Sequence, residues 1–410
     1  MGCQNPQTIN FTLETSKKNS EINSLNIDQN KENISDETPK VEITYDYSFQ
    51  LELFNELNKI YLGKNLIISP LGIFQILSLT TNGAKEETRA QMLEALKANS
   101  IEELNKINYE ILSGVKCRKS LKISNKILSK FTPLKNFCDI AEKYSCSINS
   151  YQDLKKISSN INSEIHGKIP INLEPLSPLE VMILVNTIYF NNAWIFEFDE
   201  KLTKKLPFYN HGKKEIKVET MSQQNIFNYY EDEKIQMIEL KFEFDDMTSI
   251  VILPNDKIDI NTYINDISNS KKEFSSLFSK LTPKNVYLEL PKFEQQFSEN
   301  LNQILINMGM KKAFDKNLAD FSGITESTNI YIERVEHFTY LKIDEKIVEG
   351  AAETMLRMNE GGALIERPIL DNKIYIMKIN RPFLFLIRCS ALRKYQDMIF
   401  MSKIEEFMPK

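Results

Sequence analysis

The chain has few of the residues that usually build cross-links or metal sites. Its 410 residues include three histidines, five cysteines and one tryptophan. Five scattered cysteines are too few, and odd in number, for a disulfide framework. Cys138 and Cys146 lack zinc-site spacing and a nearby histidine. No run of about 18 apolar residues occurs, so the sequence predicts no transmembrane helix.

Familiar catalytic motifs are also missing. The sequence contains no Gly-x-Ser-x-Gly elbow, no glycine-rich phosphate loop followed by Lys and Ser or Thr, and no His-Glu-x-x-His. A net charge of −5 gives no reason to expect nucleic-acid binding. Hydrophobic residues at 42% and charged residues at 26% are typical of a globular protein. We therefore expect a protein that is not an enzyme and needs no cofactor, metal or nucleic acid.

The first 43 residues are polar and rich in Asn, Ser, Lys and Glu, which is typical of a disordered tail or tether. Gly2-Cys3 resembles the cleavage point of bacterial lipoproteins, where the cysteine carries the lipid. No apolar signal segment precedes it here, so an ordinary cytoplasmic start stays open. Pro6 stands where myristoylation requires Ser or Thr. We favour an extracellular or cell-surface lipoprotein over a cytoplasmic protein, with a lipid on Cys3 as its membrane contact.

The most unusual stretch lies between Ile347 and Met358. If the stretch is a strand, side chains alternate between two faces. One face carries no charge, and its first side chains are small; it consists of Val348, Gly350, Ala352, Thr354, Leu356 and Met358. The opposite face carries the charges; it consists of Ile347, Glu349, Ala351, Glu353, Met355 and Arg357. The uncharged face is compatible with entry into a sheet. A short helix followed by a loop at Gly361-Gly362 is the alternative, since Ala and Glu favour helix.

Several sequence blocks carry a resemblance to a known family. Glu349-Gly350-Ala351-Ala352-Glu353-Thr354, after Asp344-Glu345-Lys346, resembles the hinge of serpins, and residues 377–387 resemble the C-terminal signature of that family. Further blocks agree in order along the chain: residues 65–71, 83–93, 184–190 with Trp194, 290–293 and 305–324. The resemblance covers about Tyr45 to the C-terminus. It implies an α+β serpin fold over residues 44–410, with about nine helices, three β-sheets and an exposed reactive loop at about 345–374.

The resemblance also implies a function. Inhibitory serpins offer the loop to a serine or cysteine protease, which cuts it and forms an acyl-enzyme. The freed strand then inserts into the central sheet and traps the protease. The expected partner is thus a target protease, and the protein itself is expected to be a monomer. The alternative is a non-inhibitory serpin that acts as a binding, storage or chaperone protein.

The implied hinge fits insertion, because its inward face carries no charge. The hinge residues are Glu345, Ile347, Val348, Glu349, Gly350, Ala351, Ala352, Glu353 and Thr354. Two of them depart from the usual pattern: Ile347 replaces glycine and Glu353 replaces alanine, both on the outward face. Ile347 stiffens the pivot, because it is β-branched. It therefore favours slower insertion and plain cleavage.

Family spacing counted from Glu345 places the scissile bond near Gly361-Gly362. The candidates are Glu360, Gly361, Gly362 and Leu364. Arg357 would attract a trypsin-like protease, but a cut there leaves a short inserted strand, so we expect substrate behaviour.

The resemblance assigns structural roles to four further residues. Ser69, Asn186 and His337 correspond to the buried shutter beneath the central sheet, where the histidine is a hydrogen-bonded residue rather than a catalytic base. Trp194 corresponds to the breach, where the loop first enters the sheet. Gly72 replaces a second shutter serine, a change expected to weaken this network.

The segment 111–138 contains seven basic and no acidic side chains. A polyanion site at Lys116, Arg118, Lys119 and Lys122 is one interpretation. We favour a solvated strand face, because Lys122, Lys126 and Lys130 alternate with apolar residues.

Hydrophobic periodicity predicts the main elements. We expect helices over 45–62, 73–81 and 298–308, the last stopped by Gly309. We expect strands over 67–70, 182–190, 248–253, 286–290, 374–390 and 398–403.

Overall fold

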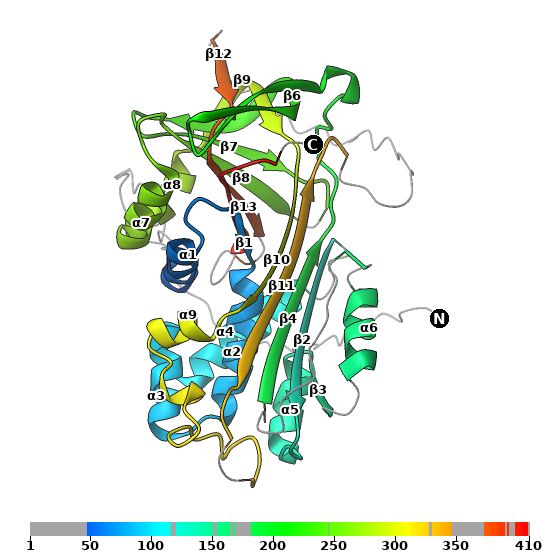
Figure 1. Ribbon diagram of the computed structural model, residues 1–410, viewed down its shortest axis with the longest axis vertical. Helices are drawn as coiled ribbons and strands as arrows, with labels where there is room; N and C mark the ends of the chain where they lie inside the picture. Colours follow the sequence, from blue (N-terminus) through cyan, green and yellow to red (C-terminus); the bar gives the residue numbers. More distant parts are fainter. Residues whose placement is uncertain are drawn as a thin grey trace, which may run out of the picture. The chain divides into compact units, whose positions relative to one another are not determined.

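The computed structural model describes residues 47–115, 120–150, 154–164, 167–168, 182–244, 246–327, 330–346, 373–389, 392 and 398–408. Contacts divide the chain into two compact units, Met1–Glu42 and Ile43–Lys410, and every described residue belongs to the second. Within these residues the unit is a mixed α+β fold (Figure 1). None of the described helices is long and apolar enough to cross a membrane.

Nine α-helices are described among these residues. They are α1 (Ser48–Ile60), α2 (Pro70–Gly83), α3 (Glu86–Ala95), α4 (Ile101–Val115), α5 (Lys135–Lys143), α6 (Leu154–Glu164), α7 (Ile260–Asn269), α8 (Lys271–Leu277) and α9 (Asn302–Asn307). Helix α2 begins at a Ser-Pro step, because Pro70 suits the first helical position and the Ser69 hydroxyl accepts a hydrogen bond from the Gly72 N–H.

The first of two described sheets has the order β10-β11-β4-β2-β3. Its strands are β2 (Leu121–Ser129), β3 (Cys146–Ser150), β4 (Met182–Phe190), β10 (Phe293–Asn300) and β11 (Arg334–Ile343). All nine residues of β4 are buried, as the apolar run predicts for a central strand. Strands β4 and β11 are parallel neighbours, whereas β10 pairs antiparallel with β11 and β2 pairs antiparallel with β4.

The second sheet contains nine strands, in the order β1-β14-β13-β8-β7-β6-β9-β12, with β5 paired to β6. The strand β6 is 18 residues long and pairs with β5, β7 and β9, so a single strand joins what would otherwise be separate sheets. The members are β1 (Leu66–Ile68), β5 (Lys204–Asn210), β6 (Lys214–Glu231), β7 (Ile235–Lys241), β8 (Met247–Pro254), β9 (Thr282–Pro291), β12 (Ile374–Lys378), β13 (Phe383–Cys389) and β14 (Met398–Ile404).

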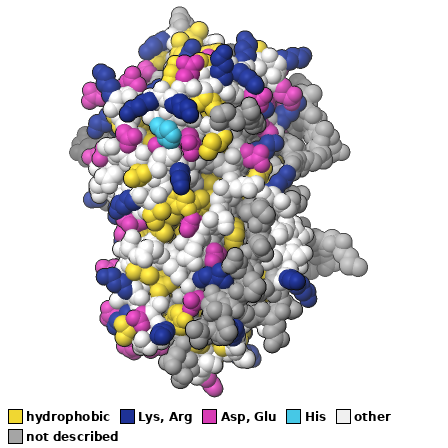
Figure 2. All heavy atoms as spheres, in the orientation of Figure 1, with side chains coloured by type: hydrophobic (Ala, Val, Ile, Leu, Met, Phe, Trp, Pro, Cys, Tyr) yellow, Lys and Arg dark blue, Asp and Glu magenta, His cyan; other side chains and the backbone are white. Residues whose placement is uncertain are grey.

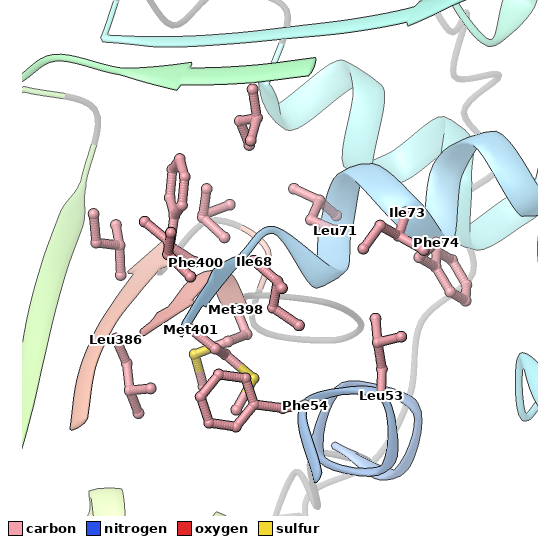
Figure 3. Close-up of a cluster of buried hydrophobic side chains, with 14 of the residues drawn as sticks. Leu53, Phe54, Ile68, Leu71, Ile73, Phe74, Leu386, Met398, Phe400 and Met401 are labelled. Atoms are coloured by element: carbon pink, nitrogen blue, oxygen red, sulfur yellow. The ribbon is translucent and has the colours of Figure 1, made fainter. Parts of the chain in front are cut away.

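The main core joins helices α1 and α2 to the C-terminal strands. Figure 3 shows buried side chains from both helices and from β1, β13 and β14 pointing toward one another. They include Leu53, Phe54, Ile68, Leu71, Phe74, Leu386, Met398, Phe400 and Met401. The first and last thirds of the domain therefore fold against each other.

Three sequence predictions about elements were wrong in detail. The strand expected over 67–70 ends at Ile68, because Ser69 caps α2 and Pro70 is its first helical residue. The helix expected from Ser298 starts only at Asn302, because β10 continues to pair with β11 as far as Asn300. The region 374–390 holds two strands, because β12 pairs with β9 whereas β13 pairs with β8 and β14. Gly309 does end its helical region, at φ +108.

Candidate functional site

The parallel pairing of β4 with β11 is the centre of the candidate site, and we call it the seam. Residues Arg334–Tyr340 of β11 lie opposite Ile183–Tyr189 of β4, with His337 opposite Asn186. After Tyr340, β11 continues to Ile343, and in this last part it pairs only with β10. The two strands therefore separate at the end of the seam that lies nearest the start of the predicted loop.

The predicted shutter residues meet beneath the seam. The Ser69 backbone N–H donates to His337 Nε2 at 3.0 Å, and His337 Nδ1 lies 2.8 Å from Asn186 Oδ1. Because Nε2 accepts, Nδ1 holds the proton and donates to Asn186. Complete burial lowers the pKa of His337 to about 3, so the imidazole is neutral at physiological pH. The histidine thus joins α2 to both strands of the seam.

Asn125, which the sequence analysis did not select, completes this network. Asn186 Nδ2 donates to Asn125 Oδ1 of β2 at 2.7 Å. A Cβ at Gly72 would lie 2.5 Å from the amide atoms of Asn186. Asn186 therefore occupies the space that a side chain at position 72 would need. The network reaches β2 through Asn125.

Trp194, the residue predicted at the breach, lies beside the end of β11. Its Nε1–H donates to the Asp344 carbonyl at 2.9 Å, and its ring stacks on Phe242 with centroids 4.5 Å apart. Asn192 is 2% exposed and exchanges two hydrogen bonds with the backbone of Phe244. The Trp194–Asp344 hydrogen bond joins the end of β11 to the segment that follows β4. The contacts with Phe242 and Phe244 join that segment to the residues that follow β7.

Glu345 stands at the start of the predicted loop, and it is buried. Its carboxylate accepts a hydrogen bond from the Thr203 hydroxyl at 2.6 Å and lies 2.9 Å from Lys292 Nζ. Burial alone would raise its pKa, but the hydrogen bonds from Thr203 and Lys292 lower the pKa below the ordinary value. The carboxylate is therefore ionised and fixes the point from which the loop departs.

Most of the predicted reactive loop lies outside the described residues. This applies to the hinge residues Ile347, Val348, Glu349, Gly350, Ala351, Ala352, Glu353 and Thr354, and to the scissile candidates Glu360, Gly361, Gly362 and Leu364. Lys116, Arg118, Lys119 and Cys3 also lie outside. The C-terminal end of β11 and strand β12, which flank the predicted loop, lie in the same half of the described domain (Figure 1).

The basic segment is only partly a solvated face. Lys122 and Lys130 are exposed, but Lys126 is 9% exposed, because α6 lies against this face of β2. The prediction of a solvated lysine at 126 was therefore wrong. Figure 2 shows acidic and basic side chains interspersed over the face in view.

Comparison with known proteins agrees with this arrangement. The family model for serpins, described as serine protease inhibitors, matches residues 44–406. The leukocyte elastase inhibitor of Xenopus laevis is 27% identical over 84% of this chain and 94% of its own. Serpin B8 of Bos taurus is 28% identical over 83% and 93%. The crystal structure of tengpin, a thermophilic serpin in the native state, has a TM-score of 0.76 at 28% identity and covers 89% and 94%.

The chain therefore belongs to the serpin family, and its fold is the serpin fold. The matched family is described by protease inhibition rather than by catalysis of a reaction.

Proposed function

We propose that this protein is a suicide inhibitor of serine proteases, with cysteine proteases as a second target class. The observation that carries the proposal is the seam, where β4 and β11 pair directly in parallel. Relatives named as an elastase inhibitor and as Serpin B8 support the same function. The uncharged inward face of the hinge supplies a strand suited to insertion.

Insertion has a favourable direction because of strand polarity. A strand that follows β11 and turns back is antiparallel to β11, and it is also antiparallel to β4, since those two are parallel. Insertion would replace one parallel pairing with two antiparallel ones, and antiparallel pairing is slightly more stable per residue. It would also add backbone hydrogen bonds. The native arrangement is then metastable relative to the inserted one.

The proposed mechanism joins this relaxation to the protease reaction. The protease nucleophile attacks the scissile carbonyl, the peptide bond breaks with release of the new amine, and the loop remains attached as an acyl ester. Hydrolysis of that ester needs an intact triad and oxyanion hole. Insertion pulls the acylated residue away with the protease, distorts this machinery and leaves the ester in place.

Covalent complex formation is the direct test. The full chain is mixed with a trypsin-like, an elastase-like and a papain-like protease, and products are separated under denaturing conditions. We expect a species at the mass of the protease plus the inhibitor without its C-terminal fragment, which denaturation releases, with at least one of them. Cleavage of the loop by all three without such a species would support the non-inhibitory alternative, which Ile347 at the pivot favours.

A further inference from the structure

Two tyrosines face each other across the seam on the side opposite the shutter. Tyr189 of β4 and Tyr340 of β11 are register partners, and their rings stack with centroids 6.3 Å apart and planes inclined by 13°. They are 6% and 4% exposed. They belong to a small apolar cluster, separate from the main core, that also contains Ile157 and Ile161 of α6. The stack is thus buried, in a cluster to which α6 also contributes.

The stack connects the two halves of the five-stranded sheet. The Tyr340 hydroxyl donates to Glu294 Oε1 of β10 at 2.9 Å, so this ring is fixed to the β10–β11 half. Tyr189 belongs to β4, which pairs with β2 in the other half. On the opposite face, His337 and Asn186 bridge the same two strands three residues away. The seam is therefore bridged on both faces.

An inserted strand cannot leave the stack intact. Adjacent strands lie about 4.8 Å apart, so one extra strand moves β4 and β11 to about 9.6 Å. Aromatic pairs interact at centroid distances of about 4.5–7 Å, so the separated rings fall outside this range. Tyr340↔Tyr189 is also the last register pair at the breach end. A strand that enters from the breach separates this pair first.

We propose that the Tyr189–Tyr340 stack is a latch that slows strand insertion and so sets the division between covalent inhibition and plain cleavage. The proposal rests on the proposed function, because it governs the same insertion step. The tyrosines are positioning residues for this step and need no contact with the protease. Loss of either ring should make insertion about 2- to 10-fold faster.

The insertion rate can be measured without any protease. The probe is a synthetic peptide with the sequence of residues 347–358, added to the full chain. The only tryptophan, Trp194, lies at the breach and donates to the Asp344 carbonyl, so its fluorescence reports the opening. We expect the peptide to enter Tyr340→Val and Tyr189→Val faster than the wild type. The double variant should be no faster than either single one, because each substitution removes the same contact.

Two variants serve as controls. Tyr340→Phe keeps the ring and should insert peptide at nearly the wild-type rate. Tyr109→Leu removes a ring contact of similar length with Tyr144, away from the seam, and should leave the rate unchanged. If Tyr340→Val does not fold, Tyr189→Leu tests the same contact from β4.

The outcomes separate the latch from the function on which it rests. Peptide uptake by the wild type with unchanged rates in both valine variants would contradict the latch alone. Purely additive effects in the double variant would also contradict it, since independent packing losses would then explain the rates. Absence of peptide uptake by the wild type would contradict both the latch and the proposed function.

Discussion

Lys292 places a positive charge beside a carboxylate that has little access to water. Glu345 is 6% exposed, and its partners are Thr203 and Lys292. Replacement of the lysine leaves a buried acceptor without its cation, which typically costs about 1–3 kcal/mol. We therefore predict that Lys292→Met lowers the free energy of unfolding by this amount in a urea titration.

The matched control is Lys378→Met, which removes a lysine whose side chain is 54% exposed and lies 3.7 Å from Glu289. Exposed ion pairs contribute at most about 1 kcal/mol, so this variant should stay close to wild type. Equal losses in the two variants would mean that Glu345 has no special dependence on its lysine.

His337 should make the native state sensitive to acid. Burial holds its folded-state pKa at about 3, whereas the unfolded value is 6.5. The unfolded chain binds the proton more readily, so stability is complete above pH 6.5 and falls as the pH drops toward 3. At about 1.4 kcal/mol per pH unit, the loss between pH 6.5 and 5 is about 2 kcal/mol. Urea unfolding across this range measures it.

The His337→Gln variant separates this effect from that of the carboxylates. It retains an amide in the shutter but has no group that titrates near pH 6. We expect a flatter dependence of unfolding free energy on pH than in the wild type, even if the variant is less stable throughout. Parallel curves for the two proteins would show that His337 does not cause the acid sensitivity.

The candidate site residues differed in whether the sequence alone could identify them. Ser69, Asn186, His337 and Trp194 were selected through family resemblance, and the structure brings the first three together. Asn125 was missed, because an asparagine within an ordinary strand pattern gives no signal until its cross-strand neighbour is known. Its role depends on the pairing of β2 with β4.

At the scale of elements, the hinge should tolerate charge on one face and not on the other. Ala352 is predicted to face inward after insertion, and a buried unpaired charge there costs several kcal/mol. We expect Ala352→Arg to be cleaved by the target protease with little covalent complex. Gel densitometry of complex against cleaved inhibitor gives the ratio.

The neighbouring residue provides the control for this prediction. Glu353 is predicted to face water, so Glu353→Arg should still form the complex. A loss of complex in both variants would indicate that charge on the loop, rather than its burial, controls the reaction. Retention in both would contradict strand insertion in the predicted register.

The type of an element was predictable where the periodic pattern was long. The residues at which an element begins and ends were not predictable. The near-continuous apolar run at 182–190 predicted β4 correctly. Ser298 shows why ends are harder to predict: its local pattern suits a helix, but pairing with β11 extends β10 to Asn300. The burial of Lys126 likewise depends on α6, which lies elsewhere in the sequence.

At the scale of the whole molecule, the sheet order could not be derived from local pattern. β1 pairs with β14, although more than 300 residues separate Leu66 from Lys403. The parallel neighbours β4 and β11 are also far apart in sequence. Composition and periodicity contain no information on such contacts, so only the family resemblance supplied the fold. The proposed metastability is likewise a property of the complete sheet.

Thermal unfolding before and after one cut in the loop, between Glu353 and Leu370, tests the central claim most directly. If the loop inserts between β4 and β11, the cut protein should unfold tens of degrees higher than the intact one. Such a rise exceeds what a few kcal/mol give a domain of this size. An unchanged or lower midpoint would show that the hinge does not insert and would contradict the account of a metastable inhibitor.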